Sequence, residues 1–339
     1  MGGGGSRTVA AMTAASDIDP DRFTIHRASP RRFEQAYVRE GAGGVPLLCV
    51  HGWPETKRLF WKVIEPLAAS GFEVIVPDLR GFGDSELGPD GFHDVPSHAH
   101  DLYALVHDVL GHERVVLLGG DLGGVVVQDL ALRHPDWVER LVLFNAPLPF
   151  DKERMASLPD TRPAREAGDY FVRQGTDPDG LAAELTTPEQ RRRYIATFYT
   201  SRFWAHPGSF IAPDAPPGRY GGSDVVDFHT EPFGSAEHLR ASFGAYESVF
   251  NDAARSEAPL LGRNEHTRTM ILFGPSDHVL YPDFDRMAAI VFPNHVGPFL
   301  LRDAGHFVPW EAPHALASAT IAFCGDLLSG RDDFGDVKS

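Results

Sequence analysis

Short apolar runs alternate with amphipathic helical patterns along most of the chain, and this alternation constrains the fold more than any other feature. Runs this short, bounded by turn-forming residues, are typical of buried strands. They occupy residues 45–50, 72–76, 115–118, 141–144, 270–273 and 299–301. Patterns with one apolar helical stripe lie at residues 60–69, 100–110, 125–132 and 315–328. Strands that alternate with helices predict an α/β fold in which helices cover both faces of a mostly parallel sheet.

The alternation stops between residues 147 and 251, where no strand-like apolar run occurs. This region has charge-rich helical patterns at residues 188–204 and 235–250 and a cluster of loop-forming residues at 213–222. Because strands resume after it, we expect residues 147–251 to form a helical cap that is inserted into the core.

The remaining segments complete the expected domain organisation. We expect residues 21–146 and 252–330 to form an α/β core, with an amphipathic strand near one edge of the sheet at residues 31–39. The first residues are rich in Gly, Ala, Ser and Thr and lack the continuous apolar stretch of a signal peptide. We therefore expect residues 1–20 to form a disordered tail.

The balance of charges excludes some classes of function. Lys and Arg total 31 and Asp and Glu total 47, so the formal net charge is −16. This excess of negative charge repels phosphate groups, so neither nucleic acid nor an anionic membrane is an expected partner. No apolar run is long enough to predict a membrane span. Cys49 and Cys324 both lie in apolar runs, which favours buried thiols in a reducing cytoplasm.

A glycine-rich turn connects the strand expected at residues 115–118 to a helix. Gly119, Asp121 and Gly123 in this turn fit the nucleophile-elbow pattern, with Asp where Ser usually stands. Such an elbow presents its central side chain at the carboxyl edge of the sheet, where α/β folds bind ligands. The alternative is a loop aspartate that caps the following helix.

The loop after the first buried strand has the sequence His51-Gly52-Trp53-Pro54. A loop at this place can supply a backbone N–H group to an oxyanion hole. We therefore expect the N–H groups of Trp53 and Leu122 to form that hole, and the side chains of His51 and Trp53 to line the substrate pocket. The simpler interpretation is a tight turn built on Gly52 and Pro54.

A carboxylate and a histidine follow the last two expected strands. Because the ends of parallel strands meet at one edge of a sheet, Asp277 can hold His306 in one tautomer while His306 takes a proton from water. The order Asp121, Asp277, His306 is that of nucleophile, acid and base in this kind of fold. His278, which adjoins Asp277, is a rival for the histidine role, and a lone histidine is more often structural.

Taken together, these motifs resemble the α/β-hydrolase superfamily and, within it, the epoxide hydrolases that carry a helical cap. The resemblance spans about residues 30–328. It rests on His-Gly-Trp-Pro at 51–54, Pro-Asp-Leu-Arg-Gly-Phe-Gly-Asp-Ser at 77–85, Gly-Gly-Asp-Leu-Gly at 119–123, Asp277 and His306. It implies the α/β-hydrolase fold, and an aspartate nucleophile narrows the activity to epoxide hydrolases and dehalogenases.

The chemistry of an aspartate nucleophile also limits the possible substrates. Attack by a carboxylate on an electrophilic carbon gives an alkyl ester, whereas attack by a serine would leave an ether that water does not readily hydrolyse. His306 can then activate water to attack the carboxyl carbon of Asp121, with the oxyanion held by backbone N–H groups. This chemistry indicates an alkyl electrophile, either an epoxide or a carbon–halogen bond. Of these two, the resemblance favours the epoxide, which with water gives a vicinal diol.

The oxygen of an opening epoxide needs an O–H donor, and the resemblance implies two tyrosines from the cap. The segment 239–247 looks like the family's cap helix that carries the second tyrosine, which makes Tyr246 the first choice. Tyr170 lies early in the cap, about where the family's first donor falls. Tyr194 and Tyr199 are its rivals, and packing alone explains many tyrosines in such positions.

The main alternative is a haloalkane or haloacid dehalogenase that uses the same triad. Haloalkane dehalogenases usually have Trp after the nucleophile, and fluoroacetate-type enzymes have Arg beside it, whereas this chain has Leu122 and Val125 there. Leu122 also departs from the epoxide hydrolases, which often have an aromatic residue at that position. The non-enzymatic alternative is a catalytically silent hydrolase scaffold that binds a small ligand.

The expected partners are few. The histidines lack ligand spacing with cysteine or glutamate, so we expect no metal and no organic cofactor. We expect a small-molecule epoxide as the substrate, and both a monomer and a homodimer stay open.

Overall fold

The computed structural model of the chain describes residues 17–158, 165–211, 219, 223–279 and 284–329. The predicted loop at residues 213–222 therefore lies almost wholly outside the described residues, as do residues 1–16. Within the described ranges, no helix has both the length and the apolar character that crossing a membrane requires.

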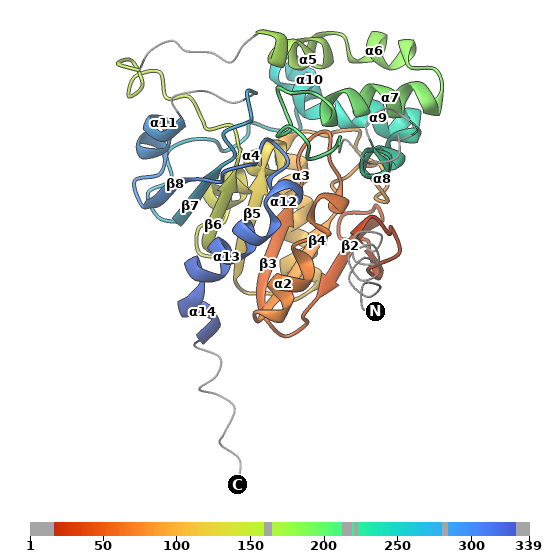
Figure 1. Cartoon of the computed structure of the whole chain (residues 1–339). Coiled ribbons are helices and arrows are strands. Elements are labelled where there is room, and N and C mark those ends of the chain that lie inside the picture. The colour runs from red at the N-terminus through yellow and green to blue at the C-terminus, as the bar shows by residue number, and fades with distance from the viewer. Residues whose placement is uncertain (1–16, 159–164, 212–218, 220–222, 280–283, 330–339) are drawn as a thin grey trace, which may run out of the picture.

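The described residues form one eight-stranded sheet with the order β1-β2-β4-β3-β5-β6-β7-β8 (Figure 1). Its strands are β1 Ile25–Ala28, β2 Gln35–Glu40, β3 Val45–Val50, β4 Phe72–Pro77, β5 Val115–Gly120, β6 Val138–Phe144, β7 Arg268–Phe273 and β8 His295–Leu300. Only β1 with β2 and β2 with β4 pair in antiparallel fashion. The other neighbours are parallel, which confirms the predicted mostly parallel α/β sheet.

Each apolar run predicted as a buried strand overlaps a strand of the sheet, but the prediction of burial was wrong for residues 299–301, because Phe299 and Leu300 are exposed at the edge strand β8. Three of the runs were predicted too short at their beginnings, because β6 starts at Val138, β7 at Arg268 and β8 at His295. The alternating pattern at residues 31–39 marks β2, which begins only at Gln35. Strand β1 was not predicted, because its sequence Ile-His-Arg-Ala has no apolar run and lies half-exposed at the edge of the sheet.

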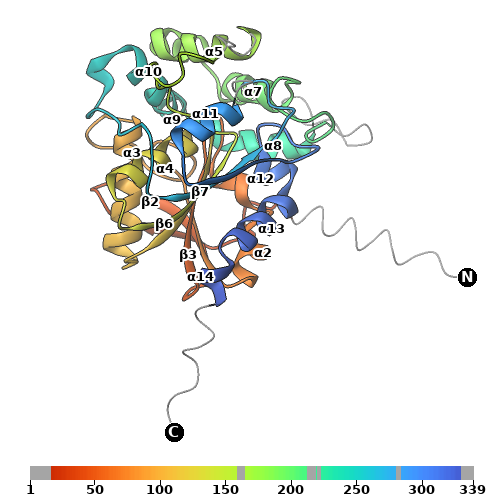
Figure 2. The same cartoon turned by 90° about the vertical axis from the view of Figure 1, so that its left-hand side faces the viewer.

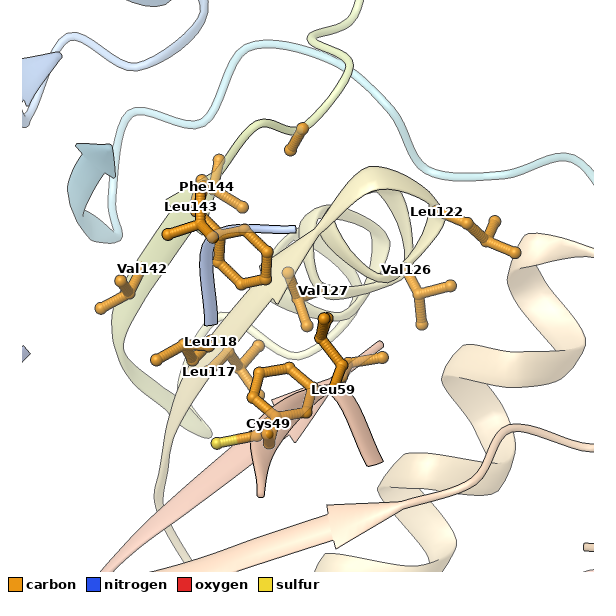
Figure 3. Packing of buried hydrophobic residues seen from close by; sticks show 14 of the residues in the cluster. Cys49, Leu59, Leu117, Leu118, Leu122, Val126, Val127, Val142, Leu143 and Phe144 are labelled. Atoms are coloured by element: carbon orange, nitrogen blue, oxygen red, sulfur yellow. The ribbon is translucent and has the colours of Figure 1, made fainter. Parts of the chain in front are cut away.

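Helices cover both faces of the sheet, as Figure 2 shows from the side. One face carries α3 (Val95–Tyr103) and α4 (Asp121–Arg133), which pack against each other. The other face carries α2 (Ile64–Ala69) and α13 (Pro313–Phe323). The buried cluster of the core includes Cys49, Leu59, Leu117 and Val127, which are among the residues labelled in Figure 3. Both cysteines are free and buried.

Between β6 and β7 the described residues form helices and no strand. These helices are α5 (Arg165–Thr176), α6 (Pro178–Glu184), α7 (Pro188–Tyr199), α8 (Asp224–Thr230), α9 (Ala236–Ser242) and α10 (Gly244–Phe250). They form a layer over the sheet, at the top of Figure 1, which we call the helical layer (residues 165–250). A division of the chain into core and cap after residue 146 and before residue 252 stays a prediction.

The disordered tail predicted at residues 1–20 is too long, because Asp17, Ile18 and Asp19 contact the rest of the chain. The backbone carbonyl of Asp19 accepts a hydrogen bond from the Trp61 indole N–H at 3.0 Å, and Ile18 packs against the core. Arg22 also forms an ion pair with Asp17 at 2.7 Å. One apolar residue between acidic neighbours gave too weak a pattern to predict these contacts.

Candidate active site

The register of the sheet brings the loops that carry the predicted site residues to one edge. Val50 pairs with Gly119, Gly120 with Phe144, and Phe144 with Leu272. The residues that follow these strand ends therefore lie next to one another, at the carboxyl edge where α/β sheets bind ligands.

Asp121 occupies a sharp turn between β5 and α4. Its φ of +46° lies in the left-handed region, which side chains other than glycine adopt only where the surroundings enforce it. The neighbouring glycines explain how the turn fits. A Cβ on Gly120 would lie 2.1 Å from the Phe144 ring, and a Cβ on Gly123 would lie 2.2 Å from the carbonyl oxygen of Val50. The turn therefore requires glycine at positions 120 and 123.

Asp121 is 6% exposed, and one hydrogen bond holds its carboxylate and another its backbone. Its Oδ1 accepts the backbone N–H of Trp53 at 2.8 Å. Its own backbone N–H donates to the carbonyl oxygen of Asn145 at 3.0 Å. Gly52 allows this approach, because a Cβ there would lie 2.5 Å from the Cβ of Asp121. Leu122, the other predicted N–H donor, lies in the first turn of α4, where N–H groups have no partner within the helix.

The structure brings His306 and Asp277 together beside Asp121. The Nδ1–H of His306 donates to Asp277 Oδ2 at 2.8 Å, and its Nε2 lies 3.5 Å from Asp121 Oδ2. Burial lowers the pKa of His306, but the charges of Asp277 and Asp121 outweigh burial and raise it well above the usual value. His278 is exposed, and its backbone N–H donates to the carbonyl oxygen of Phe203, so it does not take the place of His306.

Tyr170 and Tyr246 both contact Trp53 from the helical layer. The Tyr170 ring stacks on the Trp53 ring with centroids 5.4 Å apart, and the Tyr246 ring meets the Trp53 ring edge-on at 5.8 Å. Burial and the charge of Asp121 raise the pKa of both hydroxyls well above the usual value. Both tyrosines are therefore O–H donors at neutral pH.

The rival tyrosines have other partners. Tyr194 accepts a hydrogen bond from the Gln174 amide at 3.0 Å. Tyr199 donates to the carbonyl oxygen of Pro54 at 2.8 Å and stacks on Phe307. The Tyr199 hydroxyl therefore donates within the protein. Burial raises the pKa of Tyr194 to about 12, and Asp121 is not among the charges that act on it, whereas Asp121 raises the pKa of both Tyr170 and Tyr246.

That His51 lines the substrate pocket stays a prediction, and both nitrogens of its ring face backbone groups. Its Nε2 accepts the N–H of Leu79 at 3.1 Å, and its Nδ1 is 2.9 Å from the carbonyl oxygen of Gly52. The ring is fully buried, and burial lowers its pKa, so a neutral imidazole holds two loops together. The side chain of Trp53, by contrast, packs among the site aromatics, with its indole N–H donating to Ser242 Oγ at 3.1 Å.

Asn145 is a site residue that the sequence did not reveal. It follows β6, has a φ of +40° and is fully buried. Its Nδ2 donates to Asp277 Oδ2 at 2.8 Å, and its Oδ1 accepts the N–H of Gly274 at 2.7 Å. Since its carbonyl oxygen also accepts the N–H of Asp121, Asn145 connects the nucleophile turn to the carboxylate that orients His306.

Glu55 is a second residue that was not predicted, although it directly follows the His-Gly-Trp-Pro motif. Its Oε2 accepts the backbone N–H of Gly52, and its Oε1 has no hydrogen-bond partner among the described residues. Burial raises the pKa of this carboxyl to about 8, with His306 lowering it and Asp121 raising it. The carboxyl is thus mostly protonated at neutral pH. In the described part of the chain, no three His, Cys, Asp or Glu residues are grouped so that they could hold a metal ion.

Comparison with known proteins identifies the class of protein that this fold and site define. A family model described as alpha/beta hydrolase fold matches residues 45–313, so this chain belongs to the α/β-hydrolase fold family. Soluble epoxide hydrolase from Corynebacterium sp. (strain C12) is 40% identical over 308 residues, 90% of this chain and 98% of that protein. Within the fold family, the chain therefore belongs with the epoxide hydrolases.

Two further relatives agree with this assignment. Epoxide hydrolase A from Mycobacterium tuberculosis (strain ATCC 25618 / H37Rv) is 28% identical over 319 residues, 86% of this chain and 94% of that protein. The solved structure of epoxide hydrolase CorEH without ligand has a TM-score of 0.73 at 25% identity, covering 90% of this chain and 99% of that one.

Proposed function

We propose that this protein hydrolyses epoxides to vicinal diols through an ester formed on Asp121. The observation that carries the proposal is a buried carboxylate with an oriented imidazole on one side, while Tyr170 and Tyr246 pack on Trp53, whose backbone N–H binds that carboxylate. The kinship with epoxide hydrolases of nearly the same length supports it.

In the first step, Asp121 attacks a carbon of the epoxide while the ring carbon–oxygen bond breaks. The free oxygen is Oδ2, because Oδ1 is already bound to the N–H of Trp53. The ring oxygen leaves as an alkoxide, which Tyr170 and Tyr246 stabilise by hydrogen bonds and to which one of them passes its proton. Raised pKa values suit this role, since each hydroxyl keeps its proton until the alkoxide forms.

In the second step, His306 Nε2 removes a proton from water, and the hydroxide attacks the carboxyl carbon of Asp121. The N–H groups of Trp53 and Leu122 stabilise the resulting oxyanion, an effect of about 3–4 kcal/mol per donor in comparable sites. The ester bond then breaks, the diol oxygen takes the proton from His306, and the second proton of the water leaves the Asp121 carboxyl to restore the tyrosine hydroxyl as the carboxylate returns. Asp277 fixes the tautomer in which Nε2 can accept that proton.

This site fits dehalogenation less well than epoxide hydrolysis. A halide ion needs N–H donors, and the indole N–H of Trp53 already donates to Ser242 Oγ. The hydroxyl pair near Asp121 is the feature that an epoxide oxygen requires. A silent binding scaffold would not need Asp277 and His306 to be joined beside Asp121 as they are.

A panel of epoxides and haloalkanes, assayed side by side for diol and halide, tests the proposal. We expect diol from at least one epoxide such as styrene oxide, little halide from any haloalkane, and loss of diol formation in Asp121→Asn. Halide release without diol formation would favour dehalogenation, and neither product would favour a binding scaffold.

Two finer proposals concern location and assembly. We propose a cytoplasmic location, supported by two free buried thiols, which suit a reducing compartment. Cell fractionation tests it. A homodimer stays a prediction, and light scattering at several protein concentrations decides between it and a monomer.

A further inference from the structure

The two loops that carry Asp277 and His306 are both bonded to one short segment of the helical layer, residues 203–206. The backbone N–H of His306 donates to the carbonyl oxygen of Trp204 at 2.7 Å, and the N–H of His278 donates to that of Phe203 at 2.9 Å. The Trp204 ring also lies 4.5 Å from the His306 ring. The placement of the base therefore depends on a segment outside the sheet.

Gly305 makes this close approach possible. A Cβ at that position would lie 2.4 Å from the carbonyl oxygen of Trp204 and 2.6 Å from the backbone nitrogen of His206. Real Cβ contacts are longer than this, so any larger residue would push the His306 loop and the 203–206 segment apart.

The carboxylate of Glu311 also stabilises the contact between the His306 loop and residues 203–206. Glu311 is the last residue of α12 (Val308–Glu311). Its Oε2 accepts the N–H groups of Gly305 and Phe307, both at 2.9 Å, and these residues flank His306. Its Oε1 accepts the N–H of His206 at 2.6 Å. One side chain thus joins the backbone on both sides of the base to the helical layer.

We propose that Glu311 is a positioning residue for the hydrolytic half of the reaction, because it holds the His306 loop against residues 203–206. The inference rests on the proposed function, in which Asp121 forms the ester without a base and His306 acts only in the second step. Loss of the Glu311 carboxylate then slows hydrolysis of the ester far more than its formation.

The charge of Glu311 agrees with this role. Burial raises its pKa to about 6, against the lowering effect of the backbone N–H groups that it accepts. The side chain is therefore mostly a carboxylate at pH 7.5, and hydrogen bonds to a charged acceptor are stronger than those to a neutral one. A glutamine has similar shape but only one acceptor oxygen for three N–H donors.

The test compares the two half-reactions in Glu311→Gln and the parent protein. Enzyme is mixed with styrene oxide, the fluorescence of Trp53 and Trp204 follows ester formation and decay, and mass spectrometry measures the alkylated protein. We expect the rate of hydrolysis to fall between about 10-fold and 100-fold, as for a reacting group displaced by about 1 Å. Ester formation should stay within about threefold, so the alkylated protein accumulates.

Two further variants keep the test decisive. Gly305→Ala separates the same two segments while leaving Glu311 intact, so it should give the same selective loss of hydrolysis and replaces Glu311→Gln if that variant does not fold. Glu73→Gln is the matched control. Glu73 is also buried and accepts a backbone N–H, that of Gly43 at 2.7 Å, but at the amino end of β4. Both half-reactions should be unchanged in it.

His306→Gln separates failure of this inference from failure of the proposed function. If His306→Gln accumulates the alkylated protein but Glu311→Gln and Gly305→Ala do not, the positioning role is wrong and the function stands. Equal slowing of both half-reactions in Glu311→Gln would also overturn it. If neither the parent nor His306→Gln is ever alkylated by an epoxide, the proposed function fails and the positioning role fails with it.

Discussion

The two carboxylate oxygens of Asp121 have different surroundings, and we therefore expect them to have different roles in the reaction. Oδ1 is bound to the N–H of Trp53, where an oxyanion would form during hydrolysis. Oδ2 lies 3.5 Å from His306 Nε2 and is the oxygen left to attack. A single aspartate can thus act as nucleophile in one step and as the electrophilic centre in the next.

The tyrosine pair gives a prediction with built-in controls. Tyr170→Phe and Tyr246→Phe should each slow ester formation about 10-fold to 100-fold, because each removes a hydrogen bond to the developing alkoxide. Tyr194→Phe and Tyr199→Phe should leave that rate within about threefold, although Tyr199→Phe should cost about 1 kcal/mol of stability through its bond to Pro54. Single-turnover kinetics with an epoxide measures these rates. An equal effect at all four positions would contradict the assignment.

Charge coupling between Asp121 and His306 gives a second prediction. Asp121 is one of the two carboxylates that raise the pKa of His306, so removing its charge should lower that pKa. The same change occurs when the ester forms, which frees His306 to accept a proton from water. NMR titration of the His306 ring in the parent and in Asp121→Asn measures the shift, and an unchanged pKa would refute the coupling.

Sequence motifs could predict the residues that follow strand ends in recognisable patterns, such as Asp121 and His306. Asn145 could not be predicted, because its role depends on a left-handed backbone and on the loops after β7 and β8 meeting around its amide. The contacts of the His51 ring could not be predicted for a related reason. Its motif position was correct, but the direction of its side chain is set by backbone partners in other loops.

At the scale of elements, the turn from β5 into α4 depends on glycines that leave no room for a side chain. Gly120→Ala should lower the free energy of unfolding by about 1–3 kcal/mol, because its Cβ would overlap the Phe144 ring. Gly262→Ala is the matched control, since nothing lies within 4 Å of its Cβ position, and it should change stability by less than about 0.5 kcal/mol. Urea unfolding compares the two. Equal stability of both variants would contradict this packing argument.

The helical segment predicted at residues 235–250 is two helices, α9 and α10, and the break has a consequence for the site. Ser242 ends α9 and accepts the indole N–H of Trp53, whereas Tyr246 in α10 meets the same ring edge-on. Gly244 lies at the break against His93, where a Cβ would come within 2.7 Å. The apolar periodicity could not predict this break, because it follows from contact with a distant loop.

At the scale of the whole molecule, the site is made by loops of the sheet from below and by the helical layer from above. The alternation of strands and helices predicted the sheet, since buried parallel strands have continuous apolar runs. It could not predict how residues 203–206 contact the loops of Asp277 and His306, because those contacts use backbone groups that any sequence possesses.

The buried carboxyl of Glu55 should affect how stability varies with pH. Its pKa is raised from 4.5 to about 8 in the folded state, so the folded state binds the proton more tightly than the unfolded state. Its contribution to stability is therefore greatest below pH 4.5 and is lost as the pH rises toward 8. Glu55→Gln keeps an acceptor for the N–H of Gly52 but cannot ionise. Denaturant unfolding from pH 5 to 8.5 should show a shallower decline for the variant, and parallel profiles would refute this.

One isotope measurement tests the central claim, that Asp121 forms an ester with the substrate. With enzyme in excess over epoxide in ¹⁸O-labelled water, a single turnover is analysed for label in the diol and in the peptide that contains Asp121. We predict an unlabelled diol and a labelled Asp121, because the diol takes its new oxygen from the carboxylate and water restores it. Label in the diol of that first turnover, with none in Asp121, would show direct attack by water and contradict the account.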